Sequence, residues 1–346
     1  MRVVIVGASG NVGSALLRRL ADEPVVTSLV GVAHRVPRSD GSSTVVPPFG
    51  AAEWVRCDLT DPAEVVAAAL QEAFAGADAV VHLAWAIQPS HSRGRLRQIN
   101  VEGTRRVATA ARGAGVGHLV VASSVGAYAA AAGDHPRTED WSTDGIPTSD
   151  YSRDKVAVER FLDAFEEQAP EVVVSRVRSA LVFQQEAASE IARYFLGQPA
   201  TAAVRRLDPF PVLPWPAGLT LQAVHADDLA EAYAAILVGR HPGAFNVAAP
   251  DVLTGQDVAD VVSAGRLREV SPRLARAAVA AGWRLRAVPV GEGWLDLALG
   301  VPVLDSSRAR ELLRWSPSVT GRAALRELVD GIRARRGTQS PPLLPA

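Results

Sequence analysis

The stretch Gly7-Ala8-Ser9-Gly10-Asn11-Val12-Gly13 decides the fold, because it joins a strand-like apolar run, residues 2–6, to a helix-like segment, residues 14–21. Its three glycines occur where a backbone must turn tightly, approach a pyrophosphate and pack a helix on a sheet. The following helix offers free N–H groups and its positive dipole end to an anion. The stretch therefore predicts a dinucleotide-binding loop, with a purely structural glycine turn as the alternative.

Residues 1–125 alternate between short apolar runs and helix-like segments, which is typical of a parallel sheet wound with crossover helices. The predicted strands are 2–6, 28–33, 54–57, 79–83 and 118–122, and the predicted helices are 14–21, 62–74 and 99–113. We expect an α/β fold, a Rossmann-type doubly wound parallel sheet over residues 1–178, to which 220–250 return. A smaller, discontinuous substrate-binding region would cover 179–219 and 251–336. Within it the proline-rich segment 199–216 predicts irregular structure, and 337–346 predicts a disordered tail.

Composition limits the class of protein. The 346 residues include 36 basic and 37 acidic side chains, and a net charge of −1 removes the electrostatic case for nucleic-acid binding. No run of about 18 uncharged apolar residues and no secretory signal is recognisable, so neither membrane insertion nor secretion is expected. The single cysteine, Cys57, can form no internal disulfide. These features predict a globular, cytoplasmic protein that acts on a small molecule.

The end of the second predicted strand bears on the choice of dinucleotide. An acidic residue there binds the ribose 2′-hydroxyl of NAD, whereas a cation accommodates the 2′-phosphate of NADP. This chain has Ala33-His34-Arg35 at that point, followed by Arg38, and no carboxylate. We therefore expect NADP to be favoured over NAD, with solvated loop cations as the alternative interpretation.

Tyr151 and Lys155 lie four residues apart, on one face of a helix predicted over residues 151–167. An ammonium beside a phenol stabilises the phenolate and lowers its pKa towards neutrality, so the pair suits acid–base catalysis. Lys155 is also the only lysine of the chain. Ser123 and Ser124 follow the strand predicted over 118–122, at the carboxyl edge where ligands of parallel sheets bind.

Together these motifs resemble the extended short-chain dehydrogenase/reductase family, the NAD-dependent epimerase/dehydratase group. The resemblance rests on Gly7-x-x-Gly10-x-x-Gly13, Asp58-Leu59, His82-Leu83-Ala84, Asn100-x-x-Gly103-Thr104, Ser123-Ser124 and Tyr151-x-x-x-Lys155, and residues 224–228 and 305–309 resemble later family segments. It implies that Asp58 contacts the adenine, Ala84 lines the cofactor groove and Asn100 orders the site. It also makes Ser124, four residues before Tyr128, a better catalytic candidate than Ser123.

The resemblance implies a catalytic set of Ser124, Tyr151 and Lys155, and a homodimer as the family's usual assembly. The residues expected at the cofactor are Gly7, Gly10, Asn11, Val12, Gly13, His34, Arg35, Asp58, Leu59, Ala84, Asn100, Ser123, Lys155 and Ser179. No metal site is expected, because no two of the seven histidines have ligand spacing on one helix and the chain has one cysteine.

Residues that differ from the family's usual pattern limit the type of reaction to be expected. Dehydratases of the group carry an Asp-Glu pair where this chain has Val125 and Gly126, and nucleotide-sugar enzymes tend to carry Asn where it has Leu181. The apolar pocket candidates Trp85, Leu181 and Phe183 suit a carbonyl on a largely hydrophobic skeleton. We therefore expect an NAD(P)-dependent ketone or aldehyde reductase. The alternatives are an NAD-dependent sugar epimerase and a non-catalytic dinucleotide-sensing protein.

Overall fold

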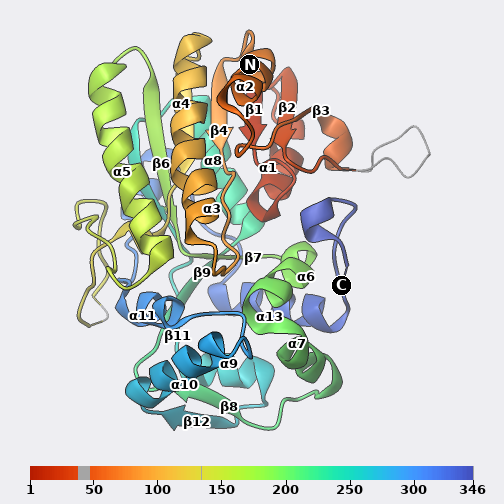
Figure 1. Cartoon of the computed structure of the whole chain (residues 1–346), viewed down its shortest axis with the longest axis vertical. Coiled ribbons are helices and arrows are strands. Elements are labelled where there is room, and N and C mark those ends of the chain that lie inside the picture. Colours follow the sequence, from red (N-terminus) through yellow and green to blue (C-terminus); the bar gives the residue numbers. More distant parts are fainter. Residues whose placement is uncertain (38–46, 134, 346) are drawn as a thin grey trace.

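The structure, a computed structural model, describes residues 1–37, 47–133 and 135–345 and has a seven-stranded parallel sheet at its centre (Figure 1). The strand order is β10-β6-β5-β4-β1-β2-β3. The strands are β1 (Arg2–Val6), β2 (Ser28–Ala33), β3 (Glu53–Arg56), β4 (Ala79–His82), β5 (His118–Ala122), β6 (Val173–Ser179) and β10 (Gly243–Val247). The order reverses between β1 and β4, so the carboxyl ends of these strands flank the crevice where such sheets bind ligands. The expected Rossmann-type α/β fold is confirmed.

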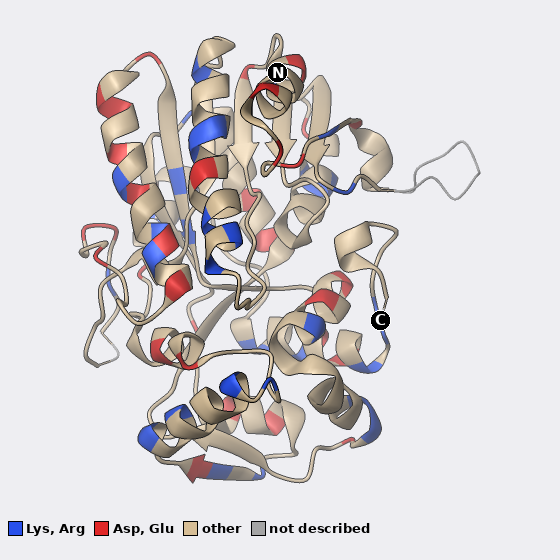
Figure 2. Cartoon of the chain, viewed as in Figure 1, with Lys and Arg blue, Asp and Glu red and all other residues tan. Residues whose placement is uncertain are grey.

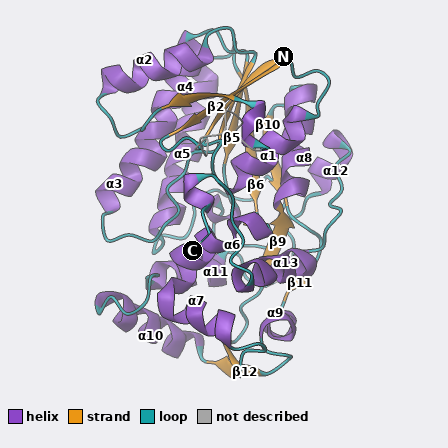
Figure 3. Cartoon of the chain, turned by 90° about the vertical axis from the view of Figure 1, so that its right-hand side faces the viewer, coloured by secondary structure: helices purple, strands orange, loops and turns teal. Residues whose placement is uncertain are grey.

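Helices cover both faces of this sheet (Figure 3). One face carries α1 (Asn11–Ala21) and α8 (Ala226–Gly239), and the other carries α2 (Ala63–Phe74), α4 (Gly103–Gly113) and α5 (Asp150–Gln168). Successive side chains of a strand point to opposite faces. Val3 and Ile5 of β1 therefore pack with α1 and α8, whereas Val4 and Val6 pack with α2 and α4. Burial on both sides accounts for the uninterrupted apolar sequence of β1.

A second, smaller region lies below the sheet in Figure 1. Its strands are β7 (Leu181–Phe183), β9 (Leu221–His225) and β11 (Val252–Leu253) in one sheet, and β8 (Leu213–Pro216) and β12 (Leu267–Val270) in another. Its helices include α6 (Ala188–Ile191), α7 (Gly197–Arg206), α9 (Gly255–Val262), α10 (Pro272–Arg284), α11 (Glu292–Gly300) and α13 (Gly321–Arg333). Its core gathers Phe183, Leu253, Leu325 and Leu328.

The proline-rich segment 199–216 is irregular only over residues 207–212, and the prediction was wrong for the rest. Helix α7 contains Pro199 in its first turn, where no intrahelical N–H donor is required. Strand β8 contains Pro214 and Pro216 but pairs with β12 alone, so one of its sides needs no donors. The expected disordered tail differs as well, because residues 337–345 form a turn in which Ser340 and Leu343 are fully buried.

Charged residues of both signs lie along α5, whereas the charged residues of α4 are all arginines, as Figure 2 shows. In the part of the chain that the structure describes, no helix is long and apolar enough to cross a membrane. Within the same ranges, no three His, Cys, Asp or Glu side chains gather as a metal site would require.

Candidate active site

Close backbone contacts build the glycine loop. A Cβ on Gly7 would lie 2.6 Å from the amide nitrogen of Ala84, and one on Gly13 would lie 2.4 Å from the carbonyl oxygen of Gly7. Gly7 also has a φ of 94°, which L side chains rarely adopt. Gly10 differs, because a Cβ there would meet only the Gly7 oxygen, at 3.5 Å. The backbone at Gly10 is therefore open to a ligand.

The loop leads into the first turn of α1, which contains Asn11 and Val12. N–H groups of a first turn have no partner within their helix, and no side chain caps this one. The side chain of Asn11 bonds elsewhere: its Nδ2 donates to the carbonyl of Val182 (3.1 Å), and its Oδ1 accepts from Gln184 (2.7 Å). The backbone amides and the helix dipole are thus left for an anion, and this cradle fits the pyrophosphate of a dinucleotide.

The residues expected at the adenosine lie beyond β2. His34 Nδ1 is 2.6 Å from Oδ2 of Asp58, whose other oxygen accepts hydrogen bonds from the amide and hydroxyl of Thr60 (2.9 and 2.8 Å). Burial raises the pKa of Asp58, but the Thr60 hydrogen bonds and the imidazole outweigh it, so the net pKa is lowered. Arg35 is exposed at the end of β2. Arg38 lies outside the described residues.

Ser124 and Tyr151 meet at the carboxyl end of β5. Tyr151 lies in the first turn of α5, which the Ser149 side chain caps, and Ser124 is near enough to lower the pKa of the tyrosine hydroxyl. A Cβ on Gly126 would lie 2.8 Å from the Tyr151 ring, so the ring rests against backbone that only glycine leaves free. Burial raises the pKa of Tyr151 to about 12, although the Ser124 side chain lowers it. The phenol is therefore protonated at neutral pH.

The ammonium of Lys155 was expected beside the Tyr151 phenol, but it lies closer to the ring of Trp85. Its Nζ donates to the carbonyl of Ala122 (2.9 Å) and lies 3.4 Å from the centroid of the Trp85 ring, but 5.7 Å from that of Tyr151. Burial lowers the pKa of Lys155 to about 7, against the opposing charge of Glu159. The expected lowering of the Tyr151 pKa is absent from this state, because burial of the phenol dominates.

Asn100 holds the loop that follows β4. Its Oδ1 accepts from the amide of Ala86 (2.8 Å), and its Nδ2 donates to the Ala86 carbonyl and to Asp154 (3.3 Å each). Both carboxylate oxygens of the buried Asp154 accept from Arg93 (2.5 and 2.6 Å). These contacts fix the backbone at Ala86, two residues after Ala84, and the role of Asn100 in ordering the site stays a prediction.

Three other predicted cofactor residues have structural partners. The hydroxyl of Ser123 donates to Glu159 (2.5 Å). Leu59 is buried against Gly103, where a Cβ would lie 3.0 Å from its side chain. Ser179 ends β6, at the same edge of the sheet as Ser124.

An aromatic wall of Trp85, Trp294 and Phe195 lines the phenol. The Tyr151 ring centroid is 5.9 Å from that of Trp85, edge-on, and 5.1 Å from that of Trp294. Phe195 packs edge-on against Trp294, also at 5.1 Å. Sequence reasoning found Trp85 but missed Trp294 and Phe195, since no local pattern links them to Tyr151.

The other two predicted substrate residues, Phe183 and Leu181, differ in their surroundings. Phe183 is 8% exposed and packs with Leu325 and Leu328 in the core of the smaller region, whereas Leu181 is 43% exposed. The structure therefore assigns Phe183 to packing and not to the aromatic wall.

A surface pocket of about 530 Å³ is lined by other residues than those of the aromatic wall. His91 stacks on Trp283 at one side of it, with ring centroids 3.8 Å apart. Arg193 and Arg286 also line the pocket, and Arg193 lies two residues before Phe195. The pocket thus presents both aromatic and cationic side chains.

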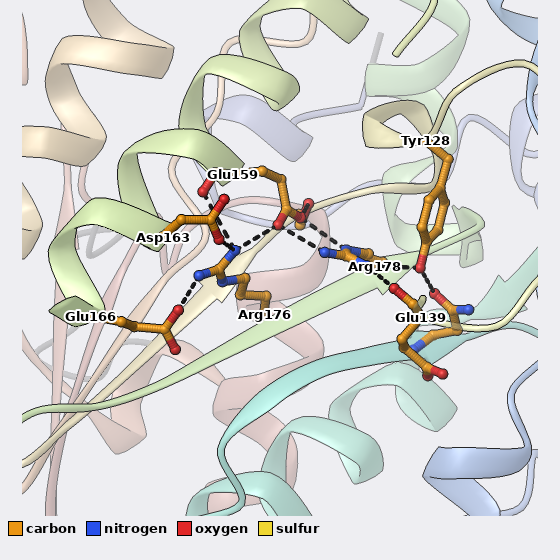
Figure 4. A network of polar contacts seen from close by, with 9 residues as sticks. Tyr128, Glu139, Glu159, Asp163, Glu166, Arg176 and Arg178 are labelled. Atoms are coloured by element: carbon orange, nitrogen blue, oxygen red, sulfur yellow. Dashed lines mark hydrogen bonds and ion pairs between the residues drawn. The ribbon is translucent and has the colours of Figure 1, made fainter. Parts of the chain in front are cut away.

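A buried network of charges lies behind the site (Figure 4). Glu159, on α5, accepts hydrogen bonds from Arg176 (3.0 Å) and from two nitrogens of Arg178 (2.9 Å each), besides that of Ser123. Arg178 also donates to the hydroxyl of Tyr128 (3.0 Å). Burial raises the pKa of Glu159, but the hydrogen bonds and charge of Arg178 outweigh it and lower the pKa to about 2.

This network makes the protein sensitive to loss of the Glu159 charge. We expect Glu159→Gln to lower the free energy of unfolding at pH 7 by about 3–5 kcal/mol, because two arginines lose their buried partner. The folded-state pKa of about 2 lies below the ordinary 4.5, so the carboxylate stabilises the fold above pH 4.5 and loses this effect as the pH falls towards 2. Urea unfolding at pH 7 and pH 3 should show a smaller difference at pH 3.

The exposed Glu171, paired with Arg112 at 2.8 Å, provides the control. Glu171→Gln should change stability by less than about 1 kcal/mol, as surface pairs do. Equal effects of the two substitutions would contradict the role of the buried network.

Comparisons with known proteins agree with this geometry. The model of the NAD dependent epimerase/dehydratase family matches residues 3–248. An uncharacterized protein of Mycobacterium tuberculosis is 28% identical over 340 residues, 97% of this chain and 31% of that protein, so the chain spans about a third of its length. L-arabinose 1-dehydrogenase (NAD(P)(+)) of Haloferax volcanii is 33% identical over 123 residues, 36% of this chain and 41% of that protein.

Among solved structures, UDP-glucose 4-epimerase of Thermus thermophilus in complex with NAD has a TM-score of 0.68 at 22% identity, covering 96% of this chain and 99% of that one. This likeness concerns the fold. The family model, however, spans most of the chain and includes the glycine loop, Ser124, Tyr151 and Lys155. From the loop to the catalytic candidates, sequence and geometry therefore agree that the chain belongs to the NAD-dependent epimerase/dehydratase family.

Proposed function

We propose that the protein is an NAD(P)-dependent oxidoreductase that reduces a ketone or aldehyde on a largely apolar small molecule. The convergence of Ser124, at the carboxyl end of β5, with Tyr151, whose ring lies against Gly126, carries the proposal. It lies at the same sheet edge as the glycine loop, with only β4 between their strands. A bound dinucleotide supplies the hydride at this edge.

Ser124, Tyr151 and Lys155 have different roles in the proposed reduction. The Ser124 hydroxyl binds the carbonyl oxygen of the substrate, and Tyr151 donates its proton to that oxygen as negative charge develops on it. A pKa of about 12 keeps Tyr151 protonated, which is the form that can donate to the carbonyl oxygen. Lys155 provides a cation on the same face of α5, and it stabilises the phenolate that remains after the transfer.

The aromatic wall supports an apolar substrate. Trp85 and Trp294 present ring surfaces beside the phenol, and Phe195 supports Trp294. Flat apolar surfaces bury a hydrophobic skeleton, while the convergent hydroxyls of Ser124 and Tyr151 fix a single polar group.

For the cofactor we propose that Arg35 binds a 2′-phosphate and gives a preference for NADPH. His34 is engaged by Asp58, whereas no hydrogen bond or ion pair occupies Arg35 within the described residues. The Thermus thermophilus structure contains NAD, so the preference needs a direct test.

Fluorescence titration with NADPH and NADH tests the role of Arg35. We expect tighter binding of NADPH, and we expect Arg35→Gln to weaken it about tenfold, as the loss of about 1.4 kcal/mol implies. NADH is the internal control, since it lacks the 2′-phosphate and its affinity should change by less than about twofold. Equal weakening of both nucleotides would remove Arg35 from this role, and binding of neither would overturn the proposed function.

An NAD-dependent epimerase is the second candidate, and the likeness to UDP-glucose 4-epimerase over 96% of this chain favours it. An epimerase keeps its dinucleotide through the reaction, whereas a reductase exchanges it at each turnover. The dinucleotide released from heat-denatured protein separates the two. Stoichiometric NAD would favour the epimerase, and little bound nucleotide with turnover of ketones by NADPH would favour the reductase.

A further inference from the structure

Residues 337–345 fold back onto the glycine loop. The hydroxyl of Ser340 donates a hydrogen bond of 2.5 Å to the carbonyl oxygen of Ser9. Ser340 and Leu343 are both fully buried. Figures 1 and 3 both place this end of the chain beside α6. The segment is thus joined to the loop predicted to bind the pyrophosphate.

Two side chains of the helical segment 188–196 bond to the backbone from the other side, one just before residues 337–345 and one within them. Ser189 donates to the carbonyl of Arg336 (2.9 Å), and Arg193 donates to that of Pro342 (2.7 Å). The segment therefore bridges the glycine loop and the smaller region.

The turn itself is compact. The amide of Thr338 donates to the carbonyl of Leu343 (2.8 Å), and the amide of Leu343 donates to that of Ser340 (2.9 Å). A Cβ on Gly337 would lie 2.3 Å from the Leu343 carbonyl oxygen and 2.6 Å from the nitrogen of Pro345. A single methyl group at Gly337 would consequently displace the turn without touching the glycine loop.

The helical segment 188–196 borders the crevice at both ends. At the adenosine end, burial raises the pKa of Glu190 to about 7, and the charge of Arg35 is near enough to oppose that rise. At the catalytic end, Phe195 packs on Trp294 of the aromatic wall. The anchor of residues 337–345 therefore lies along the proposed dinucleotide site.

We propose that residues 337–345 form a strap that holds the glycine loop and slows release of the bound dinucleotide, an inference that rests on the proposed function. Ser9 directly precedes Gly10, whose backbone is open to the pyrophosphate. A strap bonded to Ser9 restrains the wall that the dinucleotide passes as it leaves. Release then requires the buried Ser340 contact to open first, so the strap acts mainly on the dissociation rate.

Stopped-flow displacement tests the strap in the full-length protein. Bound NADPH or NADH, whichever binds more tightly, is displaced by an excess of its oxidised form while its fluorescence is followed. Ser340→Ala removes one hydrogen bond and Gly337→Ala displaces the turn. Gly113→Ala is the matched control, because a Cβ there meets no atom within 4 Å. We expect dissociation about threefold to tenfold faster for Ser340→Ala, more than about tenfold faster for Gly337→Ala, and unchanged for Gly113→Ala.

Thermal unfolding of each variant shows whether the fold persists, and Ser340→Ala remains informative if Gly337→Ala does not fold. Dissociation rates that stay at the wild-type value in folded Ser340→Ala and Gly337→Ala would overturn the strap and leave the proposed function intact. A wild-type protein that binds neither nucleotide would overturn both.

Discussion

Replacing Tyr151 by Phe is expected to lower kcat for carbonyl reduction by about a thousandfold while the affinity for the dinucleotide changes by less than about twofold. Phe keeps the ring that packs on Trp85 and Trp294, at centroid distances of 5.9 and 5.1 Å. It removes only the hydroxyl, which lies near Ser124 and is the proposed proton donor. The loss therefore falls on the chemical step and not on the shape of the site.

The measurement combines nucleotide titration with initial rates on a panel of ketones and aldehydes. Tyr128→Phe is the matched control, because the Tyr128 hydroxyl is bonded to Asn246 (2.7 Å) and Arg178 (3.0 Å) behind the site. That variant should lose about 1–3 kcal/mol of stability and keep kcat within about threefold. Retention of more than about a tenth of kcat by Tyr151→Phe would contradict the assignment of Tyr151 as the proton donor.

The parts of the candidate site whose local geometry agrees with the sequence-based expectations depend on short-range structure. Gly7 and Gly13 are constrained by contacts with Ala84 and with the loop's own backbone, as a strand-turn-helix unit dictates. Tyr151 and Lys155 share a helical face because residues four apart do so in any helix. Such features need no knowledge of how distant segments pack.

The parts that sequence missed depend on long-range packing. Trp294 reaches Tyr151 from α11, and Phe195, in the segment after α6, packs on Trp294. No sequence pattern near Tyr151 predicts either contact. Ser340 belongs to a segment rich in proline and glycine, whose composition indicates disorder until its contact with Ser9 is known. Helix α13 could have been predicted from the sequence, because Leu325, Leu328 and its other apolar residues recur at helical spacing.

The pKa values of Tyr151 and Lys155 show a second limit of prediction from sequence. Spacing predicts an ammonium beside a phenol, but it does not report how much water each group loses. In the structure burial dominates both groups, raising the pKa of Tyr151 to about 12 and lowering that of Lys155 to about 7.

Lys155→Met is expected to abolish turnover and yet to stabilise the protein by about 2 kcal/mol at pH 6. The pKa of Lys155 falls from an ordinary 10.5 to about 7 on folding, so the unfolded chain binds more protons between these values. Charging the buried ammonium therefore opposes folding fully below pH 7, and this cost disappears as the pH rises through 10.5. The whole shift corresponds to roughly 5 kcal/mol, which the hydrogen bond to Ala122 and the contact with Trp85 partly offset.

Met fits this position because its thioether packs well on the face of Trp85. The substitution also leaves no carboxylate unpaired, since Asp154 keeps Arg93 and Glu159 keeps Arg178. Urea unfolding of both proteins at pH 6 and pH 9.5 should show a gain at pH 6 that shrinks at pH 9.5. Lys155→Arg, which stays charged at both values, should show no such gain. A Met variant that is less stable than wild type at pH 6 would mean that the ammonium contributes to folding. A more stable variant would mean that the cation lowers stability and is retained for catalysis with Tyr151.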